Sequence, residues 1–88
     1  MGKYSFREKF DYHKSRVRSC GRYGIKFGGP KHSYSDGFVD AVNGRNNTSA
    51  TTYEFGKASG RAYALGQAQA KKEISKHVAK HGVFHGFD

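Results

Sequence analysis

SFREKFDYHKSRVRSC, residues 5–20, begins with a capping box: the Ser5 hydroxyl and the Glu8 carboxylate can each accept a hydrogen bond from a backbone N–H that the start of a helix leaves free. Apolar side chains then recur every three or four positions, which predicts an amphipathic helix that ends near Gly21. Its narrow apolar face comprises Phe6, Phe10, His13, Val17 and Cys20. Basic side chains occupy another face, so we expect this helix to dock on a core and to turn positive charge outward.

A second helix is expected from residue 32 to residue 44, with Ser33 or Ser35 as its N-cap and the final glycine as its C′ residue. Asp36 and Asp40 lie four residues apart in this helix, and we interpret them as the acidic residues that are common near a helix start. The predicted buried side comprises Tyr34, Phe38, Ala41 and Val42.

A third helix is predicted from a second capping box, at residues 51–54, as far as Gly82. Gly56, Gly60 and Gly66 would each destabilise its interior by about 1 kcal/mol relative to alanine. Two interpretations follow: the helix breaks near Gly66, or it makes a close crossing with another helix at Gly56 and Gly60. The crossing is favoured, because several alanines keep the same surface small.

These elements predict a mainly α protein, a single small domain over residues 1–88 with about three helices. A Gly-rich loop or a short strand is expected at 21–30, where four glycines and a proline occur. Residues 1–31 would form a basic arm and helix, and 33–81 a helical hairpin that serves as scaffold. Residues 82–88 are expected to fray, unless the two phenylalanines there pack back. The chain has seven Phe and six Tyr but few aliphatic residues, so its core must rely on aromatic rings and alanines.

Charge is segregated along the chain. Nine of the 16 Lys and Arg residues lie within the first 31 positions, beside only two acids. The net charge of +9 therefore divides into +7 for residues 1–31, zero for 32–70 and +2 for 71–88. A partner with a phosphate backbone would be met mainly by the first third of the chain.

The most specific pattern lies within residues 37–61. It reads Gly37-Phe38-x-x-Ala41-x-x-Gly44-Arg45 and, after a polar loop, Tyr53-x-x-Gly56-x-x-x-Gly60-Arg61. This pattern resembles the ribosome modulation factor family over about a third of the chain, as a helical hairpin around residues 35–65. The resemblance implies a short, basic, helical protein that binds the bacterial ribosome at ribosomal RNA and helps convert ribosomes to an inactive form. The family's Cys-Pro-Tyr is absent from the connecting loop of this chain.

We therefore expect a small basic cytoplasmic protein that binds nucleic acid, RNA ahead of DNA, and that modulates a structured RNA or the ribosome. Lys and Arg neutralise phosphates, while aromatic faces stack on unpaired bases. The expected binding residues are Arg7, Lys14, Arg16, Arg18, Arg22, Tyr23, Lys26, Arg45 and Arg61. The surface of Gly56 and Gly60 could cross a second copy of the chain in place of another helix of the same chain, so the sequence leaves a homodimer as an alternative.

A different class of function is the alternative. A phage-type small protein could place Tyr and Phe anchors on an acidic surface of a host protein, such as a nucleic-acid-processing enzyme or a defence complex, and inhibit or redirect it. Small size and aromatic richness motivate this interpretation.

Catalysis, cofactors and metals have little support in the sequence. The lone Cys20 excludes an intrachain disulfide, and no catalytic constellation accompanies it. His77, His81 and His85 recur at helical spacing, but the sequence suggests no complete set of metal ligands around them. No membrane span is expected either, because the longest uncharged stretch, residues 46–53, is short and polar.

Overall fold

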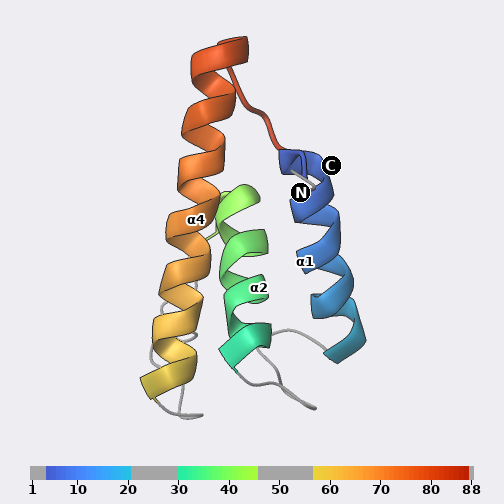
Figure 1. Ribbon diagram of the computed structural model, residues 1–88, viewed down its shortest axis with the longest axis vertical. Coiled ribbons are helices and arrows are strands. Elements are labelled where there is room, and N and C mark those ends of the chain that lie inside the picture. The colour runs from blue at the N-terminus through green and yellow to red at the C-terminus, as the bar shows by residue number, and fades with distance from the viewer. Residues whose placement is uncertain (1–3, 21–29, 46–56, 88) are drawn as a thin grey trace.

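The computed structural model describes residues 4–20, 30–45 and 57–87. In these residues it has three helices and no strand: α1 (Phe6–Cys20), α2 (Pro30–Val42) and α4 (Lys57–His81). Helix α2 lies between the other two, α1 runs opposite to α2, and α4 runs in the same direction as α2 (Figure 1). The prediction of a small, mainly α fold with about three helices is confirmed. The expected loop or strand at 21–29 lies outside the described residues.

The prediction of a helical hairpin over residues 33–81 is wrong, because its two helices do not run in opposite directions. Neighbouring helices of a hairpin run in opposite senses, whereas α2 and α4 run in the same sense (Figure 1). Residues 43–56 connect them.

The first helix starts as the capping box predicts. The Ser5 N–H donates to Glu8 Oε1 at 2.9 Å, and the Glu8 N–H donates to Ser5 Oγ at 3.1 Å. The hydrogen bond from the Ser5 backbone holds the pKa of the Glu8 carboxyl below its usual range. The predicted apolar face is confirmed for Phe10, which is fully buried, and for Phe6 and Val17, which pack against the core.

Helix α2 starts earlier than expected. Its first residue is Pro30, so neither Ser33 nor Ser35 is an N-cap, and both serines are buried within the helix. Proline suits a first helical position because the N–H that it lacks would find no partner there. The expected C′ residue is confirmed: Gly44 has φ +73°, its N–H donates to the Ala41 carbonyl at 3.1 Å, and the Arg45 N–H donates to the Asp40 carbonyl at 2.7 Å.

Helices α2 and α4 approach each other through a pair of glycines. A Cβ added to Gly66 would lie 2.0 Å from the Tyr34 carbonyl oxygen, and one added to Gly37 would lie 2.1 Å from the Tyr63 carbonyl oxygen. Helix α4 runs unbroken through this point, so a break near Gly66 is wrong. A close crossing does occur, at Gly37 and Gly66. Gly56, one of the two glycines expected at the crossing, lies outside the described residues.

The C-terminal segment packs back on α1. Rings of Phe84 and Phe87 lie 5.2 Å and 4.8 Å from the ring of Phe6, and Phe87 lies 5.2 Å from Phe10. The expectation that this segment frays is therefore wrong for residues 82–87, and the alternative, that its phenylalanines pack back, is confirmed. The segment crosses from the end of α4 to the start of α1 (Figure 1). The aromatic core expected from the composition is built around Phe10, Phe38, Val39, Val42 and Ala70.

Candidate functional site

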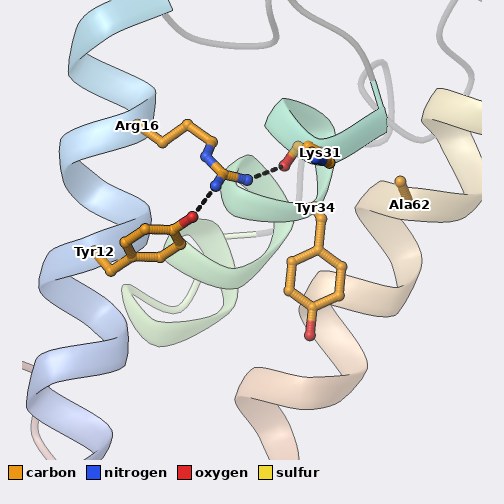
Figure 2. A pocket seen from close by; sticks show the side chains of 5 residues that line it. All are labelled: Tyr12, Arg16, Lys31, Tyr34 and Ala62. Carbon is orange, nitrogen blue, oxygen red and sulfur yellow. Dashed lines mark hydrogen bonds between the residues drawn. The ribbon is translucent and has the colours of Figure 1, made fainter. Parts of the chain in front are cut away.

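A cleft lies where α1, the start of α2 and the first turns of α4 meet. Its volume is about 470 Å³. The side chains that line it are Tyr12, Arg16, Lys31, Tyr34 and Ala62. Figure 2 shows Arg16 extending from α1 across to Lys31 at the start of α2. We call this the Arg16 cleft.

The guanidinium of Arg16 is held in place by three contacts. It donates a hydrogen bond to the Tyr12 hydroxyl and another to the Lys31 carbonyl at 3.3 Å, and its carbon lies 4.8 Å from the centre of the Tyr12 ring. Tyr12 and Arg16 are four residues apart on α1, so they share one helix face. A guanidinium carries five N–H donors in a planar fork, which leaves donors that can bind an oxyanion.

Tyr34 supplies the second aromatic side chain of the cleft. Burial is the main cause that raises the pKa of its phenol; the Glu73 carboxylate raises it further, and the Lys9 ammonium lowers it. The phenol therefore stays protonated at neutral pH and can donate a hydrogen bond. The N-terminal end of α2, where the helix dipole is positive, adjoins the same cleft through Lys31.

Helix α2 also contributes to a set of buried polar side chains that the sequence did not indicate. The Tyr63 hydroxyl donates to Asp40 Oδ2 at 2.7 Å, and His32 Nε2 lies 3.5 Å from Asp36 Oδ2. Asp36 and Asp40 were expected to be ordinary helix-start acids, but both are almost fully buried because α2 is covered on two sides.

His13 contributes no positive charge near neutral pH. Its Nδ1 lies 2.8 Å from the hydroxyl oxygen of Ser35. Burial, and after it the charge of Arg16, lower the pKa of His13 to about 4. Ser35 is fully buried, so this contact positions α1 on α2 and offers no accessible nucleophile.

Every acidic side chain in the described residues is engaged within the protein. Glu8 caps α1 and Asp11 pairs with Arg7 at 3.3 Å. Glu73 pairs with Lys9 at 3.0 Å, and the two aspartates of α2 are buried. The acidic side chains therefore all contact other groups of the protein, while many basic side chains are exposed.

The structure brings only part of the predicted binding set together. Arg16 forms the cleft with Tyr12 and Lys31, neither of which belonged to the predicted set. Lys14 lies with its ammonium 5.5 Å from the centre of the Phe10 ring, on another side of α1. The remaining described members, which lie outside the cleft lining, are Arg7, Arg18, Arg45 and Arg61. The members outside the described residues are Arg22, Tyr23 and Lys26.

A signal for the missed residues does exist in the sequence. Tyr12 and Arg16 are spaced by four on a predicted helix, which places an aromatic ring under a guanidinium. The contribution of Lys31 and Tyr34 depends on how α2 docks against α1, which no local pattern encodes.

No metal site is apparent in the part of the chain that the structure describes. Within it, no three His, Cys, Asp or Glu side chains gather as metal ligands. His77 and His81 lie close, with ring centres 4.6 Å apart, but the ring of His77 also packs against Phe6 and Phe84.

A scan against protein-family models, a search of curated proteins and a search of solved structures each found no match to this chain. Among the described helices, none has the length and apolar character needed to cross a membrane.

Proposed function

We propose that this protein binds structured RNA at the Arg16 cleft, through phosphate contacts and aromatic stacking. The observation that carries the proposal is the fixed guanidinium of Arg16 between the Tyr12 ring and the start of α2. An oriented guanidinium binds a phosphate with two parallel hydrogen bonds, and Lys31 adds a second cation.

The aromatic residues of the cleft favour nucleic acid over a simple anion. Tyr12 is 57% exposed, so its ring can receive an unpaired base. Stacking on an aromatic side chain contributes about 1–3 kcal/mol per base. Structured RNA presents unpaired bases in loops and bulges, whereas duplex DNA keeps its bases stacked.

The charge distribution supports the same proposal. The chain carries +9 overall, and its described acids are engaged in internal contacts. Exposed Lys and Arg would thus meet a phosphate backbone with few carboxylates beside them, because Glu8 and Asp11 are the only exposed acids among the described residues. The ribosome as the target rests on the resemblance of residues 37–61 to ribosome modulation factors, and it is the narrower form of the proposal.

Binding of a labelled RNA stem-loop, measured by fluorescence anisotropy across salt concentrations, tests the proposal. Arg16→Gln removes the fork and should weaken binding about tenfold, and it should reduce the slope of log affinity against log salt by roughly 0.7–0.9. Tyr12→Ala should weaken binding by a similar factor, because it removes both the stacking surface and a support of Arg16.

Lys72→Gln is the matched control, because this exposed lysine of α4 does not line the cleft. It should change the affinity less than threefold. Wild-type affinity that does not respond to salt, or an Arg16→Gln variant that binds like wild type, would contradict the proposal.

A protein-binding function is the second candidate. It is favoured by large apolar side chains that lie on the surface, among them Tyr4 at 68%, Leu65 at 62% and Val83 at 58% exposure. Such side chains can anchor a protein partner. A tagged full-length chain that retains one defined protein after nuclease digestion, and that has no affinity for free RNA, would favour this function over RNA binding.

A further inference from the structure

A second basic groove lies at the opposite end of α1 from the Arg16 cleft. It is formed by the first turns of α1, the C-terminal half of α4 and the C-terminal segment, and its volume is about 400 Å³. Three cationic side chains line it: Arg7, Lys76 and Lys80. We call it the tail groove.

The cations converge because of helix periodicity. Lys76 and Lys80 are four residues apart on α4, and so are His77 and His81, so all four fall on neighbouring positions of one side of the helix. The imidazoles of His77 and His81 add N–H donors beside the two ammonium groups. Arg7 faces them from another element.

Arg7 is oriented by its neighbours. Its guanidinium carbon lies 5.2 Å from the centre of the Phe87 ring, and it donates a hydrogen bond to the Phe87 carbonyl at 3.3 Å. It also pairs with Asp11 at 3.3 Å, a contact between two half-exposed side chains that contributes little stability. Folding of the C-terminal segment onto α1 thus completes the groove.

One acid lines the groove, and its charge is already countered. Glu73 is 7% exposed; its carboxylate accepts hydrogen bonds from Lys9 Nζ at 3.0 Å and from Gln69 at 3.2 Å. Three cations and two imidazoles therefore line the groove beside one carboxylate, and of these charged groups Glu73 is paired with Lys9 and Arg7 with Asp11.

We propose that the tail groove binds a phosphate group. Convergent cations from two elements suit an oxyanion, and the rings of Phe6 and Phe87 at the same groove offer an apolar surface beside it. This inference rests on the proposed function only for the source of the phosphate, which is either the end of an RNA strand or its internal backbone.

Pyrophosphate titrated into the full-length ¹⁵N-labelled protein tests the groove without RNA. Amide shifts should concentrate at residues 5–7, 73–81 and 87. Lys76→Gln/Lys80→Gln should weaken pyrophosphate binding at least tenfold. Lys71→Gln/Lys72→Gln is the matched control: it removes the same charge from the same helix at exposed positions outside the groove lining, and it should weaken binding less than threefold.

The source of the phosphate is tested with two RNA oligonucleotides that differ only in a 5′-phosphate or a 5′-hydroxyl. Tighter binding of the phosphorylated strand by wild type, lost in Lys76→Gln/Lys80→Gln, identifies a strand end. Equal binding of both strands, with an equal loss in that variant, identifies the internal backbone.

Shifts spread evenly over the basic surface, absent shifts, or equal effects of the two double variants would overturn the inference. These outcomes leave the proposed function untouched, because it is judged by Arg16→Gln and Tyr12→Ala at the other cleft. Failure of wild type to bind any RNA would overturn the proposed function, while the pyrophosphate titration still decides the groove.

Discussion

The two interfaces of α2 hold the protein together by different means. Toward α4, α2 makes a backbone-to-backbone approach at Gly37 and Gly66, with a buried hydrogen bond from Tyr63 to Asp40 beside it. On the α1 side, aromatic rings pack together: the ring of Phe38 on α2 lies 4.6 Å from that of His13 and 6.2 Å from that of Phe6. The ring of Phe87 in the C-terminal segment lies 4.8 Å from that of Phe6 and 5.2 Å from that of Phe10.

This difference indicates which interface should tolerate substitutions. A glycine contact has no free volume, so any added atom must move a helix backbone. Rings that meet edge to face or tilted can shift slightly and still bury most of their surface. We therefore expect the α2–α4 interface to be the sensitive one and the α1 side to be the adaptable one.

Gly66→Ala is the strongest test of this comparison. The added Cβ would lie 2.0 Å from the Tyr34 carbonyl oxygen, so we expect a loss of about 3 kcal/mol or more in the free energy of unfolding, measured by urea denaturation. Helix propensity alone would instead stabilise this variant by about 1 kcal/mol. Ala68→Gly, at an exposed position of the same helix, is the control and should cost only about 1 kcal/mol.

Tyr63→Phe tests the buried polar contact on the same side. Removal of the hydroxyl takes one hydrogen-bond donor from the buried Asp40 carboxylate, which should cost about 2 kcal/mol of stability. A double-mutant cycle with Asp40→Asn, monitored by thermal unfolding, should show that the two losses are not additive. Additive losses would mean that the two side chains act independently.

The pH dependence of the free energy of unfolding tests the role of His13 in the packing of α1. The pKa of His13 is lowered from 6.5 to about 4, so the folded state keeps the ring neutral, and its contribution to stability is complete above pH 6.5 and is lost as the pH falls toward 4. Between pH 7.5 and 4.5, wild type should lose about 1–2 kcal/mol more stability than His13→Gln, after allowance for solvent screening. Parallel losses in the two proteins, measured by urea denaturation at each pH, would contradict this assignment.

Phe87→Leu should have the smallest effect. The ring is only partly buried and meets its neighbours at the edge of the core, so a leucine of similar bulk should cost about 1 kcal/mol or less. Leu65→Ala, at an exposed position of α4, is the control and should stay within about 0.5 kcal/mol of wild type. A loss larger than that of Gly66→Ala would reverse the comparison between the two interfaces.

Features governed by a few neighbouring residues could be predicted from the sequence. The capping box at Ser5, the apolar face of α1 and the glycine that ends α2 all depend on contacts within one or two helical turns. The start of α2 at Pro30 was missed, because serine signals inside the helix competed with the proline signal before them.

The candidate sites were only partly predictable for a related reason. Arg16 and Arg7 were expected to bind, but their partners Lys31 and Phe87 come from other elements. A basic residue can be named from composition, whereas the groove in which it acts depends on which helices lie beside it.

Spacing and residue type along the chain account for the helical stretches, the cap of α1 at Ser5, the glycine that ends α2 and the excess of positive charge, because these follow from neighbouring residues or from composition. The packing of the helices is what puts α2 in the middle, brings Gly37 and Gly66 each against the backbone of the facing helix, and buries Asp36 and Asp40. The physical reason is that burial and close approach are properties of pairs of helices. A glycine is a contact point, and an aspartate a buried acid, only once a second helix covers it.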